Sequence, residues 1–329
     1  MNEHFIKNIE IKNFKCFENF SAKDFGRVNL IGGKNNVGKT AFMEAVYVNV
    51  SAQNIKKFTG GIHSIQYMRE NLNILSKFMN NENLNNLSKE FIEKSDGLNI
   101  KSNINKTSFT IEDNDGIKKY NFHFHSQNIL VNTNEFSYDF SPVTNIEFID
   151  NFGLFNSQII DNYSSIQKKD EESYLDDLLK LLDPSIEAFK VIYEKPQCKI
   201  NGNYLDIIEL GDGVKHLISI VTSLYKCEDG YLFIDEIDNG IHYTMLDQIW
   251  KVILEVSTKL NVQVFSTTHS KECIESFNRV QKEIKKQEAK NTYYFEMARN
   301  AKTDEIFMTQ IDNEQLEYGL SHNERIRGE

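Results

Sequence analysis

Residues 33–40 read Gly33-Lys34-Asn35-Asn36-Val37-Gly38-Lys39-Thr40, which is the full pattern of a phosphate-binding P-loop. The spacing has a mechanism, because the glycines let successive backbone N–H groups curl around a polyphosphate. Lys39 is placed to reach the β and γ phosphates, and Thr40 offers its hydroxyl to Mg²⁺. The stretch therefore predicts a binding site for ATP and Mg²⁺.

The residues on either side of this loop favour an α/β fold. The apolar run 28–31 before it predicts a buried strand, and the run 41–48 after it predicts a helix. The first turn of that helix, which begins at Ala41, directs the positive end of its dipole at bound phosphate. Ala41 is therefore included among the predicted nucleotide-binding residues.

The composition describes a globular chain of 329 residues with a net charge of −11. This charge argues against a protein whose whole surface clamps nucleic acid, although it leaves room for a local basic patch. The four cysteines lie far apart without a Cys-x-x-Cys pair, so the sequence predicts neither a zinc site nor a disulfide framework. Because no leader and no long apolar run is found, we expect a cytoplasmic protein without membrane contact.

The first half of the chain contains several strand patterns. Residues 5–11 and 14–20 predict short, half-buried strands, and the alternation within 98–126 predicts an antiparallel layer with a hairpin turn at 113–116. His123 and His125 alternate with phenylalanines in this layer. Without a third ligand, we expect them to be solvent-facing hairpin residues rather than metal ligands.

A helical, charged segment follows the predicted antiparallel layer. Leucines recur at helical spacing within 174–182, and Asp183-Pro184 ends the pattern. Leucines at this spacing pack more often into the core of their own chain than against a second subunit. We interpret 127–185 as a short helical insert. A further β region, 189–193 and 198–209, bends at Asn201-Gly202.

A second group of polar residues suits ATP hydrolysis. The apolar strand within 231–236 ends in Asp235, which can hold the Mg²⁺ shell, and Glu236, which can orient and polarise the attacking water. A helix at 244–258 leads to the next strand, which ends in the run 266–269. This order places His269 at the same sheet edge as Asp235 and Glu236, where it can contact the γ-phosphate.

A third feature is a glycine-rich helix start. Gly211-Asp212-Gly213 precedes an amphipathic helix, so it provides a second helix terminus that attracts phosphate. The helix after the P-loop and this helix need not bind the same ATP molecule in the same subunit.

In this order and spacing, the motifs resemble those of the ABC-type ATPase superfamily, in its soluble branch of SMC, RecF and OLD-like AAA-family proteins. The resemblance covers most of the chain and rests on six segments: the opening 9–17, the Walker A motif 33–40, the signature-like 210–213, the Walker B motif 231–236, the D-loop-like 238–242 and the switch-histidine segment 266–270.

The resemblance implies an ATPase head with a mostly parallel core sheet, an antiparallel β layer and a short helical insert. We divide the chain accordingly into 1–126 with the Walker A motif, the insert 127–185, and 186–329 with the other motifs. The chain looks like a stand-alone OLD-like ATPase, similar to ATPase subunits of anti-phage defence systems. The 60 residues after His269 are too few for a Toprim nuclease, and 127–185 lacks the heptads of a long coiled coil.

In this family, two heads sandwich two ATP molecules, so Gly211 and Gly213 would act on the nucleotide of a second copy. The catalytic residues implied are Lys39, Glu236 and His269. This chain departs from the usual Ser-Gly-Gly signature, because Asp212 places a carboxylate near a phosphate.

Two functions remain open at this stage. One is an ATP-dependent homodimeric switch that controls a separate effector protein, such as a nuclease, in anti-phage defence. The other is a RecF-like or SMC-like DNA-binding ATPase of DNA repair or chromosome maintenance. Its candidate basic stripe, 279–290, is interrupted by Glu283 and Glu288, so we favour an exposed helix there. A membrane importer subunit fits worst, because the sequence lacks the Leu-Ser-Gly-Gly-Gln signature.

Overall fold

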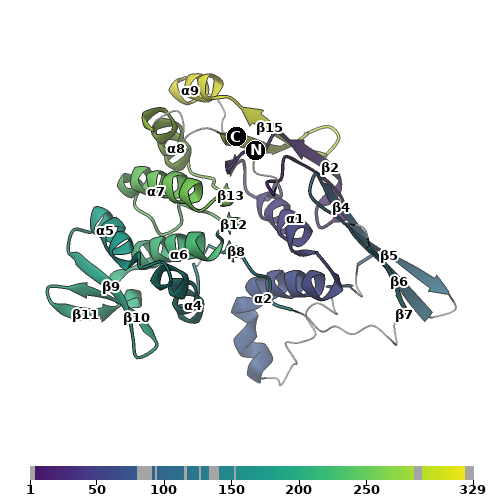
Figure 1. The fold of residues 1–329 in the computed structure, drawn as a ribbon. Helices are drawn as coiled ribbons and strands as arrows, with labels where there is room; N and C mark the ends of the chain where they lie inside the picture. Colours follow the sequence, from purple (N-terminus) through teal and green to yellow (C-terminus); the bar gives the residue numbers. More distant parts are fainter. Residues whose placement is uncertain are drawn as a thin grey trace.

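The computed structural model describes residues 4–79, 91–92, 95–114, 117–125, 127–132, 141–151, 153–284 and 291–322. These residues form an α/β fold with a central mixed sheet, an antiparallel sheet on one side of it and a group of helices on the other (Figure 1). Within the described residues, no helix is long and apolar enough to cross a membrane.

The central sheet has the strand order β15-β14-β3-β13-β12-β8. All neighbouring strands pair in parallel except β14 and β15, which are antiparallel at one edge. The sheet is therefore mostly parallel, as the sequence predicts. Its strands are β3 (Val28–Gly32), β8 (Ile146–Ile149), β12 (Tyr231–Ile234), β13 (Gln263–Thr267), β14 (Thr292–Arg299) and β15 (Ile306–Ile311).

Strands β3, β12 and β13 are buried at every position, because both faces of the sheet are covered. Alternate side chains enter two separate apolar cores. On β12, Leu232 and Ile234 belong to the core on the face of the sheet that the later helices, among them α6 and α7, cover. Tyr231 and Phe233 belong to the core on the opposite face, toward the antiparallel sheet. This alternation explains why the sequence shows continuous apolar runs here rather than a polar and an apolar face.

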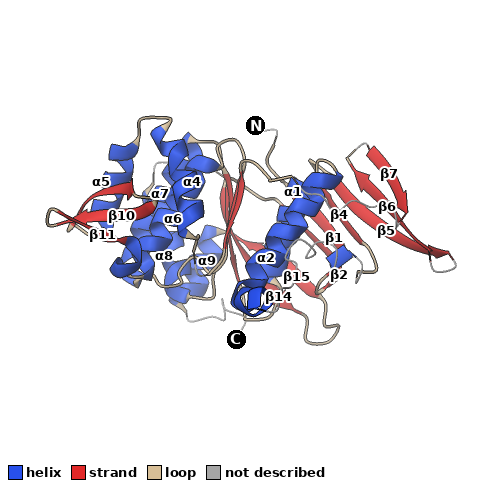
Figure 2. Ribbon diagram, turned by 90° about the horizontal axis from the view of Figure 1, so that it is seen from below, coloured by secondary structure: helices blue, strands red, loops and turns tan. Residues whose placement is uncertain are grey.

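The second sheet is antiparallel, in the order β2-β1-β4-β5-β6-β7, and helices α1 and α2 lie against it (Figure 2). Phe58 of α2 packs against Phe109, Phe122 and Phe124 of the sheet, at ring-centroid distances of 5.4 to 5.9 Å. The elements are β1 (Asn8–Phe14), β2 (Phe17–Lys23), α1 (Lys39–Ser51), α2 (Ile55–Met79), β4 (Leu98–Ser102), β5 (Lys106–Asn114), β6 (Ile117–Phe124) and β7 (Gln127–Asn132).

The predicted hairpin is present, because β5 pairs with β6 in antiparallel register. Residues 115 and 116 of its predicted turn lie outside the described residues. His125 is exposed and His123 is partly exposed, and the described residues contain no group of three side chains that could hold a metal ion.

The other face of the central sheet is covered by helices, and a small sheet in the order β11-β10-β9 lies beside them (Figure 1). These elements are α4 (Asn156–Gln167), α5 (Glu172–Leu182), β9 (Ile186–Ile192), β10 (Lys195–Ile200), β11 (Asn203–Asp206), the 3₁₀ turn η3 (Ile207–Leu210), α6 (Asp212–Lys226), the 3₁₀ turn η4 (Tyr243–Met245), α7 (Leu246–Lys259), α8 (Lys271–Glu283) and α9 (Asn313–Ser321).

The segment 127–185, interpreted from the sequence as a short helical insert, contains two helices, α4 and α5, and Leu175, Leu178 and Leu179 of α5 are core residues. It also contributes strand β7 to the antiparallel sheet and strand β8 to the central sheet. The predicted boundary at 126/127 therefore falls inside the β6–β7 hairpin. Strand β8 has four residues, and such a short strand is defined by its distant partner β12 rather than by its own sequence. The division of the chain into three parts stays a prediction.

Candidate active site

The P-loop begins directly after β3 and ends in the first turn of α1. Gly33 has a φ of +140° and Gly38, the residue before α1, has a φ of +99°. A Cβ atom on Gly33 would lie 2.2 Å from the carbonyl oxygen of Met297. Both the backbone conformation and the close approach of β14 therefore require glycine at position 33.

Lys39 is held inside this loop. Its Nζ donates hydrogen bonds to the carbonyl oxygens of Gly33, at 2.7 Å, and Lys34, at 2.8 Å, and its side chain is buried. Burial lowers the pKa of Lys39, and the nearby carboxylates of Asp235 and Glu236 act in the opposite direction. The ammonium group thus lies inside the loop, where phosphate would bind, and two loop carbonyl groups hold it there.

Asp235, at the end of β12, lies next to Thr40 of α1. The Thr40 hydroxyl is 3.1 and 2.9 Å from the two carboxylate oxygens, and the Thr267 hydroxyl donates to Asp235 Oδ1 at 2.6 Å. Burial raises the pKa of Asp235, while the hydrogen bonds from Thr267 and Thr40 lower it. Hydroxyl and carboxylate oxygens are the hard ligands that Mg²⁺ prefers, so the pair Thr40 and Asp235 fits the predicted metal position.

Glu236 follows with a left-handed backbone conformation, at a φ of +51°. Its backbone N–H donates to the Thr267 hydroxyl at 2.9 Å, and its Oε1 lies 3.8 Å from His269 Nδ1. A left-handed conformation costs a residue other than glycine on the order of 1 kcal/mol or more. In this conformation, the Glu236 carboxylate lies near the His269 imidazole at the edge of the sheet.

Sequence reasoning missed Thr267, which contacts both Asp235 and Glu236. Its signal was the hydroxyl run 266–268 at the end of an apolar strand, where a buried hydroxyl needs a partner. It also missed Lys15 and Cys16, which lie in the turn between β1 and β2. Both line the P-loop cleft, and Lys15 forms an ion pair with Glu44 of α1.

The cleft has a volume of about 410 Å³. It brings together most of the residues that the sequence predicts. The lining residues are Lys15, Cys16, Asn35, Asn36, Gly38, Lys39, Thr40, Ala41, Asp235 and Glu236. Gly33 and Lys34 act through the carbonyl groups that hold Lys39, and Val37 is buried.

Gly211, Asp212 and Gly213 do not line this cleft. Gly211 is exposed, and a Cβ atom built on it would meet no atom within 4 Å. Gly213 packs against the loop that follows Glu236, since a Cβ on Gly213 would lie 3.0 Å from the carbonyl oxygen of Gly240. At the start of α6, Gly213 therefore contacts the loop that follows Glu236 in the same chain, while Gly211 and Asp212 are open to solvent.

The loop that carries Gly240 is tied to both neighbouring strands. The Thr268 hydroxyl donates to Asp238 Oδ1 at 2.5 Å, and Asn239 Nδ2 donates to the Asn151 carbonyl oxygen at 2.5 Å. These hydrogen bonds and the Gly213–Gly240 contact place the loop after Glu236 between the strand ends and the start of α6.

Comparison with known proteins gives a consistent result. The sequence profile of the family described as "AAA ATPase domain" matches residues 5–274. A Helicobacter pylori protein named ATP/GTP phosphatase is 26% identical, and the match covers 84% of this chain and 89% of that protein. An uncharacterized protein of Methanocaldococcus jannaschii is 28% identical, and the match covers 31% of this chain and 57% of that protein.

Solved structures of SMC heads share the fold. One, an SMC head bound to the C-winged helix domain of ScpA, has a TM-score of 0.52 at 13% identity and covers 95% of this chain and 99% of its own. Another, an SMC head with an extended coiled coil bound to the C-terminal domain of ScpA from Pyrococcus furiosus, has a TM-score of 0.50 at 11% identity, with 98% and 100% covered. The predicted ATPase-head fold is thus confirmed.

Proposed function

We propose that this chain, which belongs to the AAA ATPase domain family and is an ATPase, works as a dimeric switch that controls a separate effector protein. ATP binding closes two copies of the chain on two nucleotides, and hydrolysis opens them. The effector, for example a nuclease, is held or released with this change. By resemblance, such a switch suits an anti-phage defence module in the cytoplasm.

The positions of the predicted catalytic residues support the following roles. Lys39 binds the β and γ phosphates, and Thr40 with Asp235 would hold Mg²⁺, which supplies positive charge to the phosphates when bound. Glu236 orients the attacking water and accepts its proton as the γ-phosphoryl group is transferred to that water and ADP is released. His269, 3.8 Å from Glu236, contacts the γ-phosphate from the neighbouring strand end.

The observation that carries the switch is the contact between Gly213 and Gly240. Gly240 lies four residues after Glu236, and Gly213 lies at the exposed start of α6. The water-orienting residue is therefore linked, within one chain, to a helix terminus that can bind the γ-phosphate of a second copy. This arrangement supports a site in which the state of one nucleotide is communicated to the partner.

The alternative, a DNA-binding ATPase, receives less support from the described part of the basic stripe. Arg279 donates two hydrogen bonds to Asp247, and Lys282 forms an ion pair with Glu317 at 2.6 Å. These charges are already neutralised within the chain. DNA retention that decreases steeply with salt would favour the alternative, because phosphate contacts release counterions.

The dimer is tested by the mass of the Glu236→Gln variant in solution with Mg-ATP, since a slow enzyme should accumulate the closed state. We expect a dimer with ATP and a monomer without it, and a dimer that is lost when Lys39→Ala is added. A monomer in the presence of ATP that is demonstrably bound would contradict the sandwich. Co-purification from native cells, with and without ATP, then identifies the effector.

A further inference from the structure

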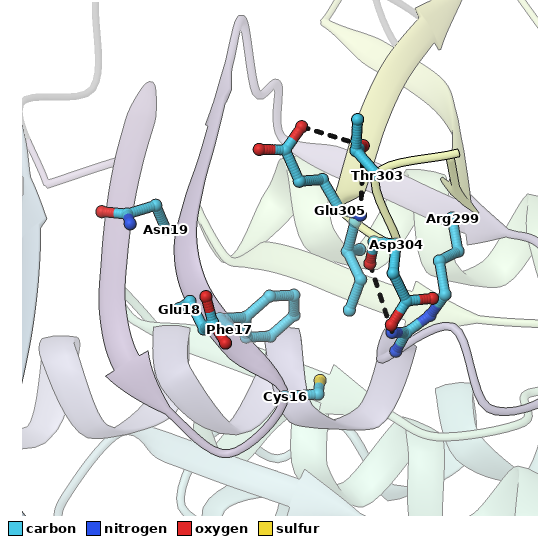
Figure 3. A pocket seen from close by; sticks show the side chains of 9 residues that line it. Cys16, Phe17, Glu18, Asn19, Arg299, Thr303, Asp304 and Glu305 are labelled. Atoms are coloured by element: carbon cyan, nitrogen blue, oxygen red, sulfur yellow. Dashed lines mark hydrogen bonds and ion pairs between the residues drawn. The ribbon is translucent and has the colours of Figure 1, made fainter. Parts of the chain in front are cut away.

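A second cavity lies beside the P-loop cleft, between the β1–β2 turn and the β14–β15 turn (Figure 3). Its volume is about 170 Å³, which is below the roughly 300–1,000 Å³ that encloses a whole drug-sized ligand. The cavity is therefore large enough for one part of a ligand, and the rest of that ligand would bind outside it. The residues that line it are Cys16, Phe17, Glu18, Asn19, Arg299, Thr303, Asp304, Glu305 and Ile306.

The cavity adjoins the P-loop. Cys16 lines both the cavity and the cleft. A Cβ atom on Gly38 of the P-loop would lie 2.9 Å from Cys16 Sγ, 3.2 Å from Phe17 Cζ and 3.5 Å from Ile306 Cδ1. Three side chains of the cavity wall thus pack directly against the P-loop, and Cys16 is shared with the cleft.

The strand order fixes which end of a nucleotide faces the cavity. The sheet runs β14-β3-β13-β12, so β3 and its P-loop separate β14 from the strands that carry Asp235, Glu236 and His269. In the proposed site, the γ-phosphate points toward these residues, on the β13 and β12 side. The nucleoside therefore leaves the P-loop on the opposite side, toward β14 and the turn that follows it.

The walls of the cavity suit a base rather than another phosphate. Glu18, Asp304 and Glu305 supply carboxylates, and the single guanidinium group, that of Arg299, is paired with Asp304 at 2.7 Å. The ion pair sets a donor group and an acceptor group side by side, as Figure 3 shows. An adenine edge carries the complementary pair, an amino donor next to a ring-nitrogen acceptor.

The β14–β15 turn that carries this pair is fixed by its own hydrogen bonds. Arg299 Nη1 also donates to the Asp304 carbonyl oxygen at 3.2 Å, and Asn300 accepts hydrogen bonds from the backbone N–H groups of Lys302, at 2.9 Å, and Asp304, at 2.9 Å. A turn held in this way presents its side chains in a constant geometry, which is what discrimination between bases requires.

We propose that the Arg299–Asp304 pair is the base-specificity element of this enzyme: it reads the amino group and the adjacent ring nitrogen of a purine nucleoside triphosphate. This inference rests on the nucleotide site proposed above. Asp304 accepts from the exocyclic amino group, and Arg299 donates to the ring nitrogen. Specificity then resides in the C-terminal hairpin, while the P-loop binds the triphosphate without regard to the base.

The experiment compares three probes by calorimetry at one salt concentration: ATP, purine riboside triphosphate, which lacks the amino group, and inorganic tripolyphosphate. We expect the wild type to prefer ATP over purine riboside triphosphate by about 5- to 10-fold, the net value of one hydrogen bond. Asp304→Ala should remove this preference, and Arg299→Ala should weaken both nucleotides. Neither variant should change tripolyphosphate affinity.

Lys302→Ala is the matched control, because Lys302 is exposed in the same turn and does not line the cavity. It should retain the wild-type preference, which separates loss of recognition from damage to the turn. An unchanged ATP preference in folded Asp304→Ala would overturn the inference while leaving the ATPase proposal intact. Absence of binding of all three probes to the wild type would instead contradict the nucleotide site itself.

Discussion

The P-loop cleft and the start of α6 differ in how much of a phosphate site one chain supplies. In the cleft, Lys39 is held by two loop carbonyl groups, and Thr40, Asp235 and Thr267 form a connected set of hydrogen bonds. At the start of α6, Gly211 faces open space. This difference supports the proposal that one chain supplies the chemical groups of the site and that a second copy supplies the remaining phosphate contacts.

The change with the greatest consequence is expected in the P-loop cleft. Lys39→Ala removes the ammonium group that the P-loop holds, so we expect ATP affinity to fall at least ~100-fold, the scale of a lost charge-assisted contact with phosphate. Lys34→Ala is the control, because the Lys34 side chain is exposed and lies outside the cleft. Its backbone carbonyl group is kept in the variant. Equal ATP affinities of Lys39→Ala and wild type in calorimetry would refute the site assignment.

The next effect separates binding from chemistry. Glu236→Gln keeps the shape of the side chain but cannot accept a proton, so we expect normal ATP binding with turnover reduced at least ~100-fold. Phosphate release under saturating Mg-ATP measures it. Turnover within a few-fold of wild type would remove Glu236 from its proposed role.

A smaller effect tests the connection between strands β12 and β13. Thr267→Val keeps the shape but removes the hydroxyl that contacts Asp235 and the Glu236 N–H. We expect about a 10-fold loss of turnover and a decrease of about 1–2 kcal/mol in the free energy of unfolding. Thr267→Ser should restore both. Ser266→Ala, one residue earlier on the same strand, should leave turnover unchanged, and an equal loss there would indicate nonspecific damage to the strand.

The weakest effect is expected at the start of α6, which a second copy completes in the proposed dimer. Asp212 lies exposed in the first turn of α6, where its charge would repel an incoming phosphate. We expect Asp212→Asn to strengthen ATP-dependent dimerisation a few-fold in the Glu236→Gln background, an effect that weakens at high salt. Asp170→Asn, an exposed carboxylate in the turn between α4 and α5, is the control. Equal dimerisation constants for both variants would place the partner's phosphate elsewhere.

The residues that the sequence predicts for the site were found through local patterns. The P-loop spacing, the acids after β12 and the histidine after β13 each follow an apolar strand, so parallel pairing brings them to one sheet edge. Strand β8 was missed because its four residues have no distinctive pattern. Thr267 was missed as an individual residue because a threonine at a strand end is ordinary until its neighbours are known.

The protein's class could be identified from its amino acids alone, since a P-loop needs a fixed run of residues whose backbone N–H groups and lysine act locally. Which distant residues share the site depends on the folded chain. Thr267 between Asp235 and Glu236, the hairpin with Arg299 and Asp304 beside the P-loop, and the Gly213 contact with Gly240 all depend on strand order and helix packing. Such contacts join residues far apart in the chain, and the packing of the two cores, rather than any local pattern, brings them together.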